Sequence, residues 1–133
     1  MTDLRLPVRV YYEDTDAGGV VYHTGYIRFF ERARTEWLRQ MGYSQQQLAE
    51  EAGVLFTVVE LAVRYVKPAR LDDMLEVLAR PEVTGGASIS FEQEIRNAGG
   101  DLLAEGQVRV ACVSAGSLKP RRLPAQLAAR MAR

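Results

Sequence analysis

The sequence has one cysteine and one histidine in 133 residues, and its net charge is zero. One cysteine cannot form an internal disulfide, and one histidine cannot supply the His and Cys clusters of a transition-metal site. The 17 basic side chains balance 17 acidic ones without any run of like charge, so the chain offers no basic face to nucleic acid or to an anionic membrane. We therefore expect no disulfide, no metal site and no nucleic-acid partner.

The chain also lacks any long hydrophobic run. Its longest stretch without Asp, Glu, Lys or Arg is residues 17–27, whereas a helix needs about 20 apolar residues to cross a bilayer. The N-terminal residues MTDLRLPVRVYYED are charged and contain no apolar core of a signal peptide. We expect no membrane span and a cytoplasmic location. The length and the 47% hydrophobic content predict one domain with its own core, over residues 1–133.

The first half of the chain predicts one strand and two helices. Residues 6–13 alternate between apolar and polar side chains, as a half-buried strand does. From about Thr24, apolar residues follow at helical spacing and stop before Gly42, which predicts one long helix of about 18 residues. A capping-box pattern, S-x-x-Q, begins a second, short helix over residues 44–53. The stripe of the long helix consists of Tyr26, Phe30, Ala33, Trp37 and Met41.

The second half of the chain predicts mainly strands. Four segments have the composition or alternation of strands, namely 54–66, 71–83, 89–96 and 103–112. Pro81 interrupts the second of them, and the last two form a hairpin. A short helix is expected over residues 125–131. This order predicts an α+β fold, an antiparallel sheet of about five strands with the helix on one face, although several α+β folds share the order.

The segment 11–23, YYEDTDAGGVVYH, combines acidic side chains, two glycines and the histidine. The helix that starts near His23 has unpaired N–H groups, which stabilise a negative oxygen. A carboxylate beside such a helix end supplies a nucleophile or base together with an oxyanion site, as acyl transfer requires. An acidic turn whose Asp side chains only cap local N–H groups would explain the same pattern, and the spacing does not distinguish the two.

Three blocks of the sequence resemble a known family. They are residues 8–39, the segment VRYVKPARLDD at 63–73, and the tail SLKPRRLP at 117–124. The first block contains the pattern Y-x-x-x-D-x-x-G-x-V-Y-H, which is met by Tyr12, Asp16, Gly19, Val21, Tyr22 and His23. The blocks resemble the acyl-CoA thioesterases of the 4-hydroxybenzoyl-CoA thioesterase group in the hot-dog superfamily, and within it the YbgC-type enzymes associated with the Tol-Pal system.

The resemblance implies a hot-dog fold, in which the sheet wraps around one long central helix. It also implies hydrolysis of an acyl-CoA to a free acid and CoA without metal or cofactor. Asp16 is implied as the essential carboxylate, acting as nucleophile or general base, and the backbone N–H at His23 as the donor that polarises the thioester carbonyl. The His23 side chain and Tyr12 are implied to support Asp16. Asp14 is a competing carboxylate, and only the family pattern favours Asp16 over it.

CoA carries several phosphates, so a neutral protein needs a local basic cluster to bind it. Two clusters are candidates: Arg64, Lys67 and Arg70, or else Lys119, Arg121 and Arg122. The expected substrate-binding residues are Gly19, Val21, Tyr22, Arg64, Lys67, Pro68 and Arg70. Glu31, two turns into the helix, is a further residue that could face the site. Cys112 is expected to be a buried core thiol rather than a nucleophile.

A five-stranded sheet leaves its edges open, so we expect the chain to pair edge to edge with a second copy. The resemblance implies a homodimer or a homotetramer built from dimers, with sites at the dimer interface. Two other functions stay open at this point. One is a non-catalytic acyl-binding or envelope-associated interaction protein with the same fold, and the other, more weakly supported, is a hot-dog hydratase.

Overall fold

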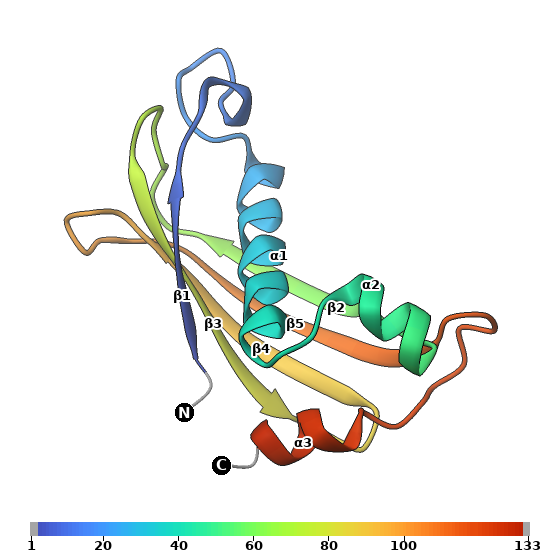
Figure 1. The fold of residues 1–133 in the computed structure, drawn as a ribbon. Helices are drawn as coiled ribbons and strands as arrows, with labels where there is room; N and C mark the ends of the chain where they lie inside the picture. The colour runs from blue at the N-terminus through green and yellow to red at the C-terminus, as the bar shows by residue number, and fades with distance from the viewer. Residues whose placement is uncertain (1–2, 132–133) are drawn as a thin grey trace.

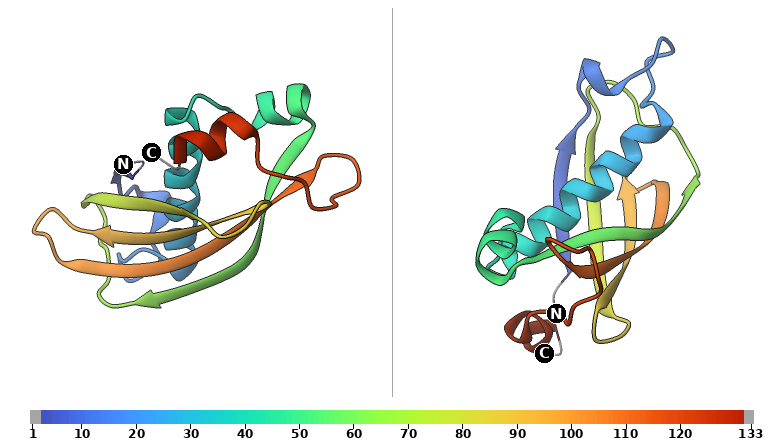
Figure 2. Two further views of the ribbon diagram at one scale, coloured as in Figure 1. Left: turned by 90° about the horizontal axis from the view of Figure 1, so that it is seen from below. Right: turned by 90° about the vertical axis from the view of Figure 1, so that its right-hand side faces the viewer.

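The computed structural model describes residues 3–131, which form a curved five-stranded sheet with a helix lying across one face (Figures 1 and 2). In chain order the elements are β1 (Leu4–Arg9), the short 3-10 turn η1 (Tyr12–Asp14), α1 (His23–Gln40), α2 (Gln45–Gln47), the wide helical turn η2 (Leu48–Ala52), β2 (Val54–Tyr65), β3 (Met74–Val83), β4 (Ser88–Arg96), β5 (Leu102–Ser114) and α3 (Ala125–Met131). This is the predicted α+β class, with the predicted number of strands.

The strands lie in the order β1-β3-β4-β5-β2, and every neighbouring pair is antiparallel. Strands β3, β4 and β5 follow one another as hairpins. Before these hairpins, the chain crosses the end of the sheet, because β2 lies at one edge and β3, the next strand in sequence, lies near the other edge. That crossing, residues 66–73, brings it alongside the loop that precedes α1, where Val21 N–H donates to the Ala69 carbonyl at 2.8 Å.

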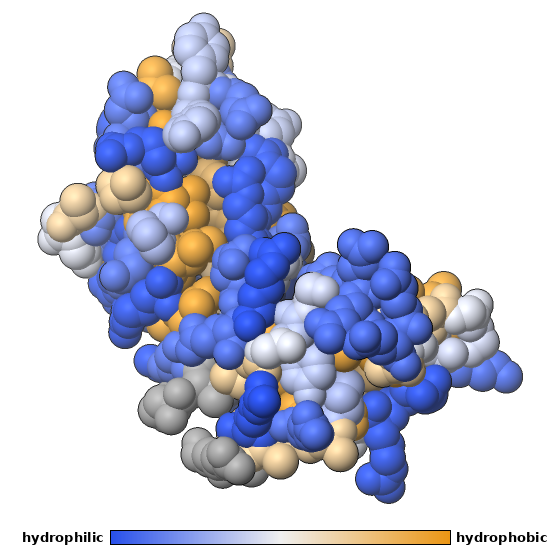
Figure 3. All heavy atoms as spheres, viewed as in Figure 1, coloured by the Kyte–Doolittle hydropathy of each residue, from blue (hydrophilic) through white to orange (hydrophobic). Residues whose placement is uncertain are grey.

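Helix α1 begins at His23 and ends at Gln40, and its 18 residues match the length predicted from the stripe. All five stripe residues are buried against the sheet. Figure 3 shows hydrophilic residues over the outer side of this helix and hydrophobic ones between it and the neighbouring strands. The strand predictions for β4 and β5 are also confirmed, because Ile89, Phe91 and Ile95 are buried while Glu92 on the other face is exposed.

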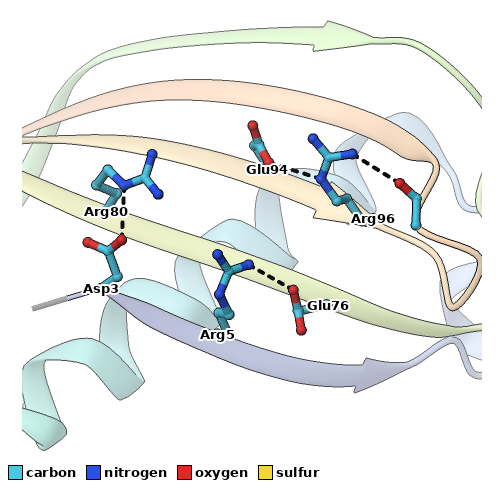
Figure 4. A network of polar contacts seen from close by, with 7 residues as sticks. Asp3, Arg5, Glu76, Arg80, Glu94 and Arg96 are labelled. Atoms are coloured by element: carbon cyan, nitrogen blue, oxygen red, sulfur yellow. Dashed lines mark hydrogen bonds and ion pairs between the residues drawn. The ribbon is translucent and has the colours of Figure 1, made fainter.

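The outer face of the sheet is polar. Arg5 pairs with Glu76 at 2.9 Å, Arg80 with Asp3 at 2.9 Å, and Arg96 with Glu94 at 3.2 Å (Figure 4). Exposed pairs of this kind contribute only about 0–1 kcal/mol each. Their main consequence is that this face presents charge to solvent, whereas the main hydrophobic cluster lies on the side of α1.

Two strand boundaries differ from the predictions. The prediction of a strand through Glu13 is wrong beyond Arg9, because the Asp14 carboxylate accepts the Tyr11 N–H at 2.9 Å and bends the chain into η1. The prediction that a strand begins at Leu71 is also wrong, since Asp72 has a φ of 71° and β3 starts at Met74. Pro81 lies beyond the last residue of β3 that pairs with β1, and an edge is where a strand tolerates proline.

Helix α1 approaches β5 closely where Phe30 meets Gly106. A Cβ atom at Gly106 on β5 would lie 2.8 Å from Cε2 of Phe30, which is fully buried. Beside it the buried Gln93 side chain donates to the Phe30 carbonyl at 3.0 Å and accepts from Arg34 at 2.9 Å. Glycine at 106 therefore sets how near the helix approaches β5.

Substituting Gly106 by alanine should push Phe30 out of its contact and destabilise the fold by about 1–3 kcal/mol, the usual cost of overpacking a core. Urea denaturation of wild type and Gly106→Ala measures the difference. Gly116→Ala is the matched control, because a Cβ atom there meets nothing within 4 Å. Equal unfolding midpoints for the two variants would contradict the proposed docking contact.

Candidate active site

The loop that precedes α1 is a tight hairpin with Asp16 at its turn. Thr15 and Val21 bridge its two arms, the Asp16 N–H donates to the Val20 carbonyl at 2.9 Å, and the Gly19 N–H donates back to the Asp16 carbonyl at 3.1 Å. Gly19 closes the turn with a φ of 77°, a backbone conformation that L side chains rarely adopt. The hairpin therefore holds Asp16 in one defined place.

The two neighbouring aspartates have different surroundings. Asp14 is only 3% exposed, and both its carboxylate oxygens are engaged, one by Arg28 at 3.2 Å and the other by the Tyr11 N–H. Asp16 is exposed, and its Oδ1 accepts the Gly18 N–H at 2.8 Å. Among the described residues its Oδ2 has no hydrogen-bond partner. Asp14 is thus a structural carboxylate, whereas Asp16 retains an oxygen that can reach a bound molecule.

The start of α1 leaves amide groups unoccupied. Tyr22 is the N-cap residue, and its side chain makes no capping hydrogen bond. Gly25 N–H donates to the Tyr22 carbonyl at 2.7 Å, but within residues 3–131 the N–H groups of His23 and Thr24 have no acceptor. Unpaired N–H groups at a helix N-terminus attract negative oxygen. The packing is close here, since a Cβ atom at Gly25 would lie 2.7 Å from Val21 Cγ1.

Asp16 and the start of α1 border the same cleft, which has a volume of about 380 Å³. Two segments far apart in sequence form its walls, and they are joined by the bond from Val21 to Ala69 and by a bridge between Val20 and Arg70. The first two blocks of the family resemblance therefore meet in one place. The lining residues are Asp16, Val21, Tyr22, His23, Tyr26, Tyr65, Val66, Lys67 and Pro68.

The structure thus brings together six of the expected site residues and separates the rest from the cleft. Tyr12 is 83% exposed and lies outside the cleft lining, in η1. Arg64 extends over the outer face of the sheet and pairs with Glu105. Arg70 is exposed just beyond the cleft, with its N–H bonded to Asp73, and Lys67 at the rim lies 3.7 Å from Asp101.

Three lining residues were not among the expected site residues: Tyr26, Tyr65 and Val66. Tyr65 Oη donates to the His23 carbonyl at 2.7 Å, and Tyr26 Oη accepts the Ala69 N–H at 2.9 Å. Burial, together with the nearby Tyr26, raises the pKa of Tyr65 above its usual value. The one sequence signal for Tyr65 is its position beside Lys67 in the second family block.

The remaining candidates lie elsewhere. Glu31 borders a different groove, between α1 and β2, where it accepts a hydrogen bond from Thr35 at 2.5 Å. Cys112 is fully buried, and burial raises the pKa of its thiol, so it stays protonated as a core residue. The basic segment around Lys119 follows the far end of β5, about 30 Å of strand from Ala104 beside the cleft. Within one chain it does not border the cleft.

The described residues contain no cluster of three or more His, Cys, Asp or Glu side chains able to hold a metal. None of the helices within residues 3–131 is long and apolar enough to cross a membrane. The polar groups of the lining residues include the Asp16 carboxylate, the His23 backbone amide and imidazole, tyrosine hydroxyls and the Lys67 ammonium group. These suffice for attack on an activated carbonyl, in which the carboxylate acts and the amides stabilise the oxyanion.

Known proteins are similar to this chain in sequence and in fold. The profile of the thioesterase-like superfamily matches residues 10–131. The acyl-CoA thioester hydrolase YbgC of Escherichia coli O6:H1 is 53% identical over 96% of this chain and 95% of its own length, and the acyl-CoA thioesterase YbgC of Haemophilus influenzae is 51% identical over 92% and 90%. The solved structure of a probable thioesterase from Bartonella henselae is 35% identical, with a TM-score of 0.85, over 92% of this chain and 99% of that one.

The chain therefore belongs to the thioesterase-like superfamily. Within it, the resemblance to YbgC-type acyl-CoA thioesterases is confirmed, and so are the hot-dog fold and thioester hydrolysis as the class of activity.

The difference between the two aspartates gives a stability prediction. Asp14→Asn removes the ion pair with Arg28 and weakens the acceptor for Tyr11, so it should lower the free energy of unfolding by about 1–3 kcal/mol. Asp16→Asn keeps an oxygen for the Gly18 N–H and should stay within about 0.5 kcal/mol of wild type. Chemical denaturation of both variants checks this, and a reversed order would refute the assignment of roles.

Proposed function

We propose that this cleft hydrolyses the thioester of an acyl-CoA, with Asp16 as the reacting carboxylate and the start of α1 as the oxyanion site. The observation that carries the proposal is that the exposed Asp16 carboxylate and His23 border one cleft, and that the N–H groups of His23 and of the adjacent Thr24 have no acceptor among the described residues. The family supplies the reaction class and the geometry supplies the residues.

Two routes are consistent with this arrangement. In the first, an Asp16 oxygen attacks the thioester carbon, the carbonyl oxygen becomes an oxyanion held by the helix amides, and collapse expels CoA thiolate. The resulting mixed anhydride is then cleaved by water. In the second, Asp16 removes a proton from water as the water attacks the same carbon. Both routes give the free acid and CoA, and both need the oxyanion donors, which typically contribute about 10²–10³ in rate.

The other expected residues take supporting roles. The His23 ring lies against Tyr22, with ring centroids 4.4 Å apart, so the two side chains form one wall of the cleft beside Asp16. Tyr12 is exposed and does not line the cleft. We propose that its side chain contacts the bound substrate or a second subunit. Lys67, and Arg70 just beyond it, are the cations that we expect to meet the CoA phosphates.

Asp16→Asn should abolish most of the hydrolysis, because an amide can neither attack the carbonyl nor accept a proton. We expect kcat to fall by about 10²–10⁴, while CoA binding and thermal stability stay near wild type. Thiol release from a panel of acyl-CoAs of different chain lengths measures it. Wild-type protein that binds acyl-CoA saturably without releasing thiol would instead favour the non-catalytic acyl-binding alternative.

We also propose that the working unit is at least a dimer, paired through β2. The two edges of the sheet differ. Edge strand β1 has six residues and carries Pro7 and exposed arginines, which prevent pairing. Edge strand β2 has twelve residues, and Val58, Val59 and Leu61 on it are exposed. A long apolar edge of this kind is stable only when it is covered.

Val59→Lys should therefore give a monomer, because each copy would bring a charged side chain into the apolar edge that the proposed strand pair covers. Light scattering on size-exclusion eluates measures the mass of each form. Leu118→Lys is the matched control, since it places the same charge on an exposed leucine away from β2. A wild-type monomer at micromolar concentration, or an unchanged mass of Val59→Lys, would contradict pairing through β2.

A further inference from the structure

We infer that Tyr65 is a positioning residue that polarises the first peptide group of α1 and so strengthens the oxyanion donor. The inference rests on the proposed function, because it concerns the amides assigned there to the thioester oxygen. Tyr65 is the last residue of β2, and apart from its place in the second family block nothing in the sequence pattern distinguishes it from the apolar residues of the strand.

The geometry holds the Tyr65 hydroxyl in place from two sides. Tyr65 Oη donates to the His23 carbonyl at 2.7 Å, which joins the end of β2 to the start of α1. Its ring meets the ring of Tyr26 edge-on, with centroids 5.2 Å apart and an interplanar angle of 73°. Tyr26 is itself buried and accepts the Ala69 N–H at 2.9 Å. The phenol is therefore aimed at one carbonyl group.

The hydrogen bond from Tyr65 holds the first turn of α1 without using the N–H groups that an oxyanion needs. A first turn is usually held by an N-cap side chain that accepts its free N–H groups, but such a cap would occupy the donors that an oxyanion needs. Tyr22 provides no side-chain cap, and the amides of His23 and Thr24 have no acceptor among residues 3–131. Tyr65 holds the same turn through a carbonyl oxygen, so both amides stay available.

The contact also acts on the donor itself. The carbonyl of His23 and the N–H of Thr24 belong to one peptide group. A hydrogen bond accepted by the carbonyl draws electron density toward oxygen and makes the N–H a stronger donor, by about 10–30% per bond in condensed phases. Because burial and Tyr26 raise its pKa, the Tyr65 phenol remains protonated, and so remains a donor, over the range in which a carboxylate reacts.

Tyr65→Phe tests the inference in kinetics. The phenyl ring keeps its packing against Tyr26, while the hydroxyl is lost. We expect kcat for acyl-CoA hydrolysis to fall by about two- to eight-fold, because weakening one oxyanion donor by about 10–30% removes that share of the free energy behind a contribution of about 10²–10³ in rate, with KM changed by less than about two-fold. Tyr43→Phe is the matched control, because the Tyr43 hydroxyl has no hydrogen-bond partner among the described residues, and it should keep the wild-type kcat.

A spectroscopic readout separates polarisation from simple support of the fold. An acyl-CoA labelled with ¹³C at the thioester carbonyl is bound to Asp16→Asn, which should not turn it over, and to the double variant that also carries Tyr65→Phe. Infrared difference spectra then report the carbonyl stretch. We expect a lower frequency with Tyr65 present, since a stronger N–H donor weakens the C=O bond.

An unchanged kcat in Tyr65→Phe, or a reduced kcat with the same carbonyl frequency in both backgrounds, would overturn the inference. The second of these results would leave Tyr65 with a structural role only. Failure of the proposed function gives a different result, because Asp16→Asn would then hydrolyse acyl-CoA as fast as wild type whatever residue stands at 65.

Discussion

In the proposed mechanism the start of α1 has to be held firmly while its own amide groups stay unoccupied, and the cleft depends on how the fold satisfies this constraint. The loop from Asp14 to Tyr22 is hydrogen-bonded through the Val21 N–H to the Ala69 carbonyl in the crossing segment, so backbone hydrogen bonds hold this end of the helix in place. Tyr65 adds a contact at the carbonyl of His23 rather than at an amide. The usual side-chain cap is missing where it would compete with a bound oxygen.

The two faces of the sheet differ in polarity, and its two edges differ in length and in exposed apolar surface. The inner face packs α1, and Gly106 lets Phe30 approach β5 closely. The outer face carries ion pairs that are worth little individually but keep it hydrated. One edge is closed by Pro7, while the long β2 edge presents Val59 and its apolar neighbours to solvent. The cleft ends on β2, because Tyr65 lines it, so the open edge and one wall of the cleft share a strand.

Much of the fold could be predicted because burial on one side leaves a period in the sequence. The apolar stripe from Tyr26 to Met41 located α1 to within one residue at its start, and the alternation from Ile89 marked β4. The first strand shows the limit of this reasoning. The alternation continued through Glu13, but the Asp14 carboxylate accepts the Tyr11 N–H and turns the chain. A single side-chain contact of this kind does not repeat along the sequence, so hydrophobic periodicity cannot predict it.

By itself, the sequence determined the α+β class, the thioesterase family and the carboxylate motif, because these are properties of residue type and order along the chain. The family pattern favoured Asp16 over Asp14, but only the tertiary structure revealed the physical difference between them, since burial and hydrogen-bond partners distinguish two identical side chains. It also placed Arg64 on the outer face and Lys67 at the cleft. It brought Tyr65 to the start of α1, because the strand order makes neighbours of residues that lie 42 positions apart.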